Sequence, residues 1–143
     1  MIVLPDVTAL ELTGVLDRGV ANAERVVIRV RATTEMAQYC LVAGWSPPGA
    51  ARPTGIPFND NFFWFGDGTV NPGDTIFVFT GLGQPRRTTV AGTQDVAYVV
   101  HWGRTTTLFA NSNITPLLIR ISEFSIGPTA VDVPQYPALP QQR

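Results

Sequence analysis

Apolar and polar side chains alternate with a period of two along much of the chain, a pattern typical of strands with one buried face. The clearest example is Arg25 to Arg31, in which Val26, Ile28 and Val30 share one face while Arg29 and Arg31 lie on the other. Thr8 to Thr13 alternates in the same way, and Asp17-Arg18-Gly19 then breaks the pattern as a turn. These segments predict half-buried β-strands in the first part of the chain.

The middle of the chain, from Phe62 to Trp102, carries the densest apolar runs. Phe62 to Phe65, Thr75 to Thr80 and Val96 to Trp102 are predicted strands. The first two are separated by Asn71-Pro72-Gly73-Asp74, which predicts a type II turn because proline suits its second position and glycine supplies the positive φ of its third. In the last strand, His101 falls on the face opposite Trp102, so we expect its side chain to face solvent or a neighbouring chain.

Three further strands follow from the same pattern: one from about Ala37 to Gly44 after a short helical turn, one over Thr105 to Ala110, and one around Leu117 to Ile121. In the last of these, Leu117, Ile119 and Ile121 are expected to face inward, opposite Arg120 and Ser122. Ser46 to Pro57 holds four prolines and is predicted to be a loop. Gly81 to Arg87 is predicted to be a second loop, which could continue to Gln94.

Seven or eight short strands separated by turn residues predict an immunoglobulin-like antiparallel β-sandwich over residues 1–126. From residue 127 the sequence changes to GPTAVDVPQYPALPQQR, which contains four prolines and is predicted to be an extended tail. This tail, residues 127–143, is either disordered or an arm that docks on a neighbour through apolar side chains such as Tyr136.

Several segments in this order resemble the lamin tail domain family. They are Glu24-Arg25-Val26-Val27-Ile28, Leu41-Val42-Ala43-Gly44-Trp45, Phe65 to Thr80 with its Asn71-Pro72-Gly73-Asp74 turn, His101-Trp102-Gly103-Arg104, and Leu108-Phe109-Ala110-Asn111. The chain departs from the family where Asn111 to Pro116 replaces an asparagine–glycine–aspartate turn. The resemblance implies an immunoglobulin-like module with a binding or structural role, and it transfers no catalytic residue.

Composition places the chain in the globular class but points to no particular ligand. It has 143 residues, of which 45% are hydrophobic, and a formal net charge of −1, so no strong field attracts nucleic acid or anionic lipid. All ten basic residues are arginine. The N-terminus lacks the pattern of a signal peptide, and no run is long enough to span a membrane. The expected location is the cytoplasm or an assembled particle such as a virion.

Candidate chemistry is sparse. The single histidine, His101, and the single cysteine, Cys40, cannot supply a zinc site, and His101 alone would have to be the base of any Ser-His-Asp arrangement. Asn59-Asp60-Asn61 with Asp67 and Asp74 is rich in the oxygen ligands that calcium prefers, but turn formation explains these residues more simply. We therefore expect no catalytic residue, metal or cofactor, and no enzymatic activity.

The candidate interaction surface consists of aromatic and arginine side chains: Phe63, Trp64, Phe65, Tyr136, Arg29, Arg31 and Arg120. Four consecutive aromatic residues, Phe62 to Phe65, cannot all face one core, so either Phe63 and Phe65 or Phe62 and Trp64 need cover, which another chain could supply. Arg29, Arg31 and Arg120 would form a patch if their strands lie in one sheet. We therefore predict a structural or protein-interaction module, a homo-oligomer self-assembling into a filament or particle. The alternative is a glycan- or nucleic-acid-binding module that uses Trp64 or Trp102 with the arginines.

Overall fold

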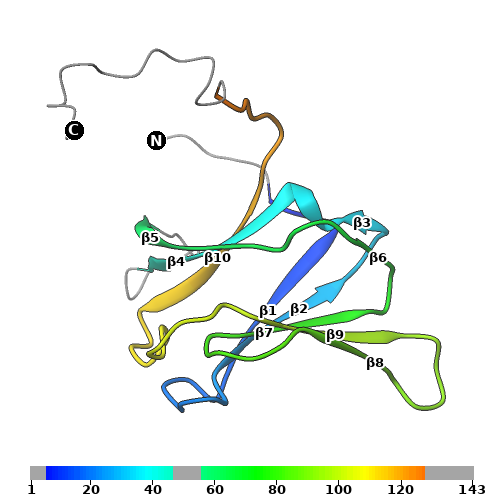
Figure 1. Ribbon diagram of the computed structural model, residues 1–143, viewed down its shortest axis with the longest axis horizontal. Helices are drawn as coiled ribbons and strands as arrows, with labels where there is room; N and C mark the ends of the chain where they lie inside the picture. The colour runs from blue at the N-terminus through cyan, green and yellow to red at the C-terminus, as the bar shows by residue number, and fades with distance from the viewer. Residues whose placement is uncertain (1–5, 47–55, 128–143) are drawn as a thin grey trace, which may run out of the picture.

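The structure is a computed structural model that describes residues 6–46 and 56–127, with the backbone alone described for residues 56–60 (Figure 1). Within these ranges, one turn of 3-10 helix (Met36–Gln38) accompanies ten strands: β1 (Leu10–Leu16), β2 (Arg25–Val30), β3 (Thr34–Glu35), β4 (Tyr39–Trp45), β5 (Ile56–Trp64), β6 (Thr69–Val70), β7 (Thr75–Phe79), β8 (Arg86–Thr89), β9 (Val96–His101) and β10 (Ile114–Arg120). The prediction of an all-β fold is confirmed.

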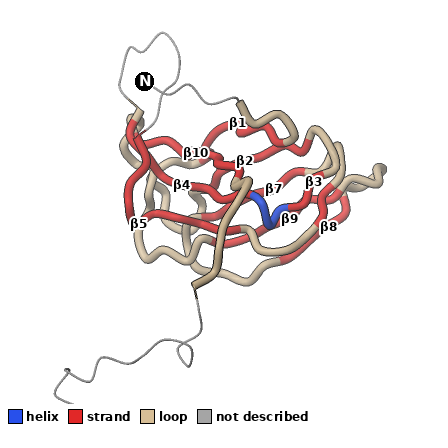
Figure 2. Tube along the Cα trace, turned by 90° about the horizontal axis from the view of Figure 1, so that it is seen from above, coloured by secondary structure: helices blue, strands red, loops and turns tan. Residues whose placement is uncertain are grey.

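The strands form two packed sheets and a small ladder. The larger sheet has the order β1-β2-β7-β9-β8, the smaller has the order β10-β4-β5, and β3 pairs with β6. Neighbouring strands are antiparallel except β7 and β9, which run parallel. Figure 1 shows the three-stranded sheet as a layer above the five-stranded one, and Figure 2 looks down on that upper layer. The fold is a β-sandwich.

The core lies between the two layers and follows the alternation of the strands. Val26 and Ile28 of β2 and Val78 of β7 are completely buried from the side of the five-stranded sheet. Leu41 and Ala43 of β4 meet them from the three-stranded sheet. Alternate side chains of a strand point to opposite faces, so these contacts fix which face of each sheet is inward.

The turn predicted before β7 is present, and it places a buried carboxylate. Gly73 has φ of 95°, and the N–H of Asp74 donates to the carbonyl of Asn71 at 3.1 Å. The Asp74 carboxylate accepts hydrogen bonds from the N–H of Asn71 and from the N–H of Val96, both at 2.9 Å. Asp74 therefore joins the turn to the start of β9 and fixes the parallel β7–β9 pair at one end.

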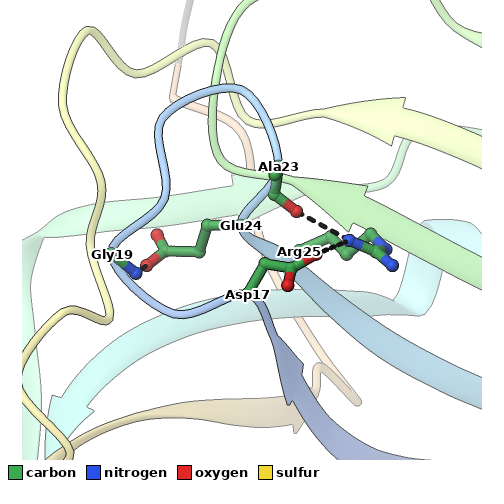
Figure 3. A network of polar contacts seen from close by, with 5 residues as sticks. All are labelled: Asp17, Gly19, Ala23, Glu24 and Arg25. Carbon is green, nitrogen blue, oxygen red and sulfur yellow. Dashed lines mark hydrogen bonds and ion pairs between the residues drawn. The ribbon is translucent and has the colours of Figure 1, made fainter.

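A second buried carboxylate, Glu24, lies just before β2. One of its oxygens accepts hydrogen bonds from the N–H of Leu108 and the Thr80 hydroxyl, and the other accepts from the N–H groups of Gly19 and Phe109. Figure 3 shows Glu24 reaching Gly19 across the β1–β2 loop, with the Asp17–Arg25 ion pair beside it. Glu24 thus ties that loop, the end of β7 and the segment before β10 to one point.

Two local predictions are wrong. Thr105 to Ala110 is not a strand, because the N–H groups of Leu108 and Phe109 bond to the Glu24 carboxylate instead of a neighbouring strand. The second loop begins as predicted, but Arg86 to Thr89 forms the edge strand β8. All four β8 residues are polar, either arginine or threonine, and all four are exposed. The segment therefore shows no alternation of apolar and polar residues from which a strand could be predicted.

The first predicted loop lies largely outside the described residues, but Ile56 and Pro57 at its predicted end belong to β5 and pair with Trp45 and Gly44. Nearly all of the predicted tail, including Tyr136, also lies outside the described residues. In the described part of the chain, no helix has both the length and the apolar character needed to cross a membrane.

Candidate interaction surface

Strand β5 separates the four consecutive aromatic residues onto two faces. Phe63 turns inward, with its ring 5.1 Å from that of Phe65 and 5.8 Å from that of Trp102, and both phenylalanines pack on the core. Phe62 and Trp64 point the other way and remain 57% and 58% exposed. Trp64 is therefore at the surface as predicted, whereas the assignment of Phe63 and Phe65 to the interaction surface is wrong. Phe62 belongs there with Trp64.

The two exposed aromatic rings lie among other apolar side chains on the outward side of the three-stranded sheet. Residues directly opposite in neighbouring strands share a face, so the register of β10, β4 and β5 groups the side chains into rows. The rows are Ile119, Cys40 and Trp64, and next to it Leu117, Val42 and Phe62. We call these six residues the outer apolar face: Phe62 and Trp64 are exposed and Leu117 and Ile119 are half-buried, whereas Cys40 and Val42 of the central strand are buried. None of them carries a charge.

The orientation of β10 corrects a prediction. Leu118 packs against the core, so Leu117 and Ile119 point outward and not inward as expected. Pro116, two residues before Leu118, lies on the same inward face and is buried. The run Leu117-Leu118-Ile119 is apolar at both parities, so the sequence alone could not tell which face is inward.

The exposed indole of Trp64 is held in place. Its Nε1–H donates to the backbone carbonyl of Ala37 at 3.0 Å, within the 3-10 turn that leads into β4. This hydrogen bond satisfies the polar edge of the ring and leaves its apolar surface for contact. A ring fixed in this way loses little further conformational entropy when a partner covers it.

The segment after β10 is also apolar and exposed. The N–H of Ile121 donates to the carbonyl of Gln38 at 2.7 Å and continues the pairing of β10 by one residue. Beyond Ile121 every described residue is exposed, and Phe124 and Ile126 are 80% and 85% exposed. We call residues 121–127 the arm. In Figure 1 the arm, coloured orange, rises from the three-stranded sheet on the side away from the five-stranded sheet.

The three candidate arginines do not form one patch. Arg29 lies on β2 in the five-stranded sheet, and Arg31 follows it and forms an ion pair with Glu11. Arg120 ends β10 in the other sheet and donates from Nε to Oε1 of Gln38 at 3.3 Å. The condition for a shared patch, that these strands lie in one sheet, is not met.

His101 lies on the outer face of the five-stranded sheet, as its parity predicted, and it is partly covered by its own chain. Its ring stacks on Phe79 with centroids 5.4 Å apart, and the loop at Gly83 passes so close that an added Cβ there would collide with the imidazole. The Nδ1 atom is buried without a hydrogen-bond partner among the described residues. His101 thus lies on the predicted side of the sheet, where its ring is half-buried because the loop at Gly83 covers part of it.

Two ionisable groups are shifted by their surroundings. Burial raises the pKa of the Cys40 thiol above 9.0, which makes the only cysteine of the chain a poor nucleophile. The N–H of Gly68 and the hydroxyl of Thr69 both donate to the Glu35 carboxylate and lower its pKa below 4.5. Both groups act within the fold, Cys40 as part of the outer apolar face and Glu35 as a link between β3 and β6.

Neither the acidic residues nor the cavities supply an evident ligand site. Among the described residues, no three His, Cys, Asp or Glu side chains lie close enough together to hold a metal ion, and the side chain of Asp60 is outside the description. One cavity, of about 290 Å³, is lined by Arg29, Val30, Arg31, Pro72 and Gly73, and a second, of about 150 Å³, is lined in part by Met36, Phe65 and Tyr98. The first volume is just below, and the second well below, the ~300 Å³ at which small-molecule sites usually begin.

Fold and surface together describe an all-β sandwich with an apolar outer face and an apolar arm beside it. No family model matches the chain, and no match was found among curated proteins or solved structures.

Proposed function

We propose that the protein is a non-enzymatic structural module, similar to lamin tail domains, that works by protein–protein contact. In this proposal it is a self-assembling subunit of a filament or particle, and the outer apolar face is its contact surface. The observation that carries the proposal is the pair of exposed aromatic side chains, Phe62 and Trp64, whose described neighbours in the outer apolar face carry no charge. Aromatic residues in such surroundings are typical of the centres of protein interfaces.

The way in which the chain uses its buried acids supports a structural role. Both oxygens of Glu24 and both oxygens of Asp74 accept hydrogen bonds from backbone N–H groups, and Glu24 also accepts one from Thr80. Carboxylates engaged in this way hold loops and strand ends together. An acid or base that exchanges protons with a substrate needs a free oxygen facing a cleft.

Binding to nucleic acid or glycan has weaker support. Many of the arginines that could contact phosphates are engaged within the chain: Arg25 with Asp17, Arg31 with Glu11, and Arg18 with the carbonyls of Phe109 and Ile114. A polymer of phosphates requires a continuous basic surface, and a sugar requires polar groups beside the aromatic ring. The rows around Trp64 contain neither.

Sedimentation velocity and light scattering on the full chain would test the proposal. We expect the wild-type chain to associate as its concentration rises from micromolar to hundreds of micromolar. Phe62→Ser with Trp64→Ser should weaken association at least about thirtyfold, because a central aromatic contact is worth about 2 kcal/mol or more. Circular dichroism should show an unchanged fold, since both side chains are largely exposed.

The matched control is Leu82→Ser with Val90→Ser, which removes two other exposed apolar side chains from the region between β7 and β9. Association that survives the Phe62 and Trp64 changes would contradict the role of this face. Salt-sensitive binding to a DNA oligonucleotide, or binding to a glycan that the Trp64 change abolishes, would favour the alternative function.

A further inference from the structure

We propose that the arm, residues 121–127, docks on the outer apolar face of a second copy of this chain, and that two copies exchange arms reciprocally. This inference rests on the proposed function and deepens it by naming the partner and the segment that the partner contributes. Each copy would supply both the apolar arm and the apolar face that receives it.

The arm has the chemistry of a segment that becomes buried on binding. Within its sequence, Ile121-Ser122-Glu123-Phe124-Ser125-Ile126, the last four residues alternate polar and apolar side chains. In an extended chain this places Phe124 and Ile126 on one side and Glu123 and Ser125 on the other. Both apolar side chains are at least 80% exposed in the single chain. One side of the arm is therefore apolar without being covered by its own domain.

The outer apolar face matches the arm in spacing and in character. Phe62 and Trp64 are two residues apart on β5, as Phe124 and Ile126 are on the arm, and extended chains rise by about 3.3 Å per residue in both places. Two arm side chains can therefore meet two face side chains at once. The polar side of the arm, with Glu123, would then remain in solvent.

The direction in which the arm leaves the sheet favours a second copy over its own face. Hydrogen bonding to Gln38 fixes Ile121 at the end of β10, and from there Figure 1 shows the segment projecting outward from the three-stranded sheet. No glycine or proline lies between Ile121 and Ile126, so the stretch lacks the residues that most readily reverse a chain.

The positions of the arm and the face also suit a two-fold symmetric pair. Arg120 pairs with Tyr39, one register position beyond the row of Ile119, Cys40 and Trp64, so the arm begins next to the face that would receive its counterpart. In an isologous dimer each surface patch meets the equivalent patch of the partner. An arm that begins beside the face can therefore cross to the partner's face while the partner's arm crosses back.

The test compares the wild-type chain with an arm variant, Phe124→Ser with Ile126→Ser, and with the face variant, Phe62→Ser with Trp64→Ser. Sedimentation velocity should show a wild-type dimer, and each variant should weaken its association at least about thirtyfold. An equimolar mixture of the two variants keeps one intact arm–face contact of the two in the dimer. The mixture should therefore associate more tightly than either variant alone and less tightly than the wild-type chain.

A disulfide test would show which residues meet. In a Cys40→Ser background, chains carrying Ile126→Cys and chains carrying Trp64→Cys are mixed and oxidised. We expect a cross-linked heterodimer, whereas Leu82→Cys, on an exposed loop elsewhere, should cross-link poorly with Trp64→Cys.

The outcomes separate this inference from the function on which it rests. If the face variant is monomeric but the arm variant associates normally, arm exchange is wrong while contact through the face stands. If the wild-type chain is monomeric at every concentration, arm exchange is wrong. An arm folded on its own face would then form an intramolecular disulfide in a single chain that carries both Ile126→Cys and Trp64→Cys. If neither variant changes association, both proposals fail.

Discussion

Glu35 shows how an exposed carboxylate becomes part of the fold. It accepts hydrogen bonds from the N–H of Gly68 at 3.0 Å and from the hydroxyl of Thr69 at 3.1 Å, and these two donors lower its pKa. Both donors lie at the start of β6 or just before it, opposite Glu35 in the β3–β6 ladder. The ionised form of this one side chain therefore helps to hold the smallest pair of strands together.

The pH dependence of this contribution has a definite sign. Because the pKa of Glu35 is lower in the folded chain than its ordinary value of 4.5, the stabilisation is fully present above pH 4.5 and is lost as the pH falls through the folded value. Glu35→Gln should lower the urea midpoint at neutral pH, and the difference from wild type should shrink as the solution is acidified below pH 4.5. Glu123→Gln, which removes an exposed carboxylate from the arm, is the control. A difference that stays constant with pH would contradict this assignment.

At the scale of the strand, β5 assigns different roles to neighbouring residues of the same type. Phe63 packs against Trp102 and Phe65, whereas Phe62 is more than half exposed. Phe63→Ala should lower the free energy of unfolding by about 3 kcal/mol through lost burial and a residual cavity. Phe62→Ala should change it by no more than about 0.5 kcal/mol. Urea denaturation at protein concentrations too low for association would measure both changes in the free energy of unfolding. Equal changes would contradict the assignment of Phe63 to the core and Phe62 to the surface.

The strands also show how far the sequence could predict the fold. In β2 Val26, Ile28 and Val30 lie on the face opposite Arg25 and Arg29, and this contrast correctly identified the buried face. In β4 and β10 the runs Cys40-Leu41-Val42 and Leu117-Leu118-Ile119 are apolar on both faces, so the pattern indicated strands but could not orient them. The candidate site depended on that orientation. Trp64 was correctly identified as a surface residue, while Leu117 and Ile119 were assigned to the wrong face.

The segment between β9 and β10, which connects the two layers, was predicted incorrectly for a different reason. Leu108 and Phe109 have the apolar character of a strand, yet their N–H groups are bound by a carboxylate that lies 84 and 85 residues earlier in the chain. Local alternation describes which side chains are buried. It carries no information about a distant side chain that accepts the backbone hydrogen bonds a strand would otherwise make.

For the molecule as a whole, Glu24 controls how the chain passes from one layer to the other. The segment between β9 and β10 leaves the five-stranded sheet and enters the three-stranded one, and it carries Phe109, which is completely buried and packs against Trp102. Glu24 holds this segment by the N–H groups of Leu108 and Phe109, while its other contacts are with the β1–β2 loop and the end of β7. A change at Glu24 should therefore affect both sheets.

Glu24→Gln preserves the shape of the side chain but replaces one accepting oxygen with an amide nitrogen that can only donate. At least one backbone N–H would lose its acceptor in a buried position, so we expect the free energy of unfolding to fall by about 2 to 4 kcal/mol. Hydrogen exchange should report the same event locally: the amides of Leu108 and Phe109, although outside any strand, should be protected in the wild-type chain and exchange much faster in the variant. Glu123→Gln makes the same chemical change at an exposed site and should alter neither measurement. If these two amides exchange in the wild-type chain as fast as those of the exposed arm, Glu24 does not hold the crossover between the layers.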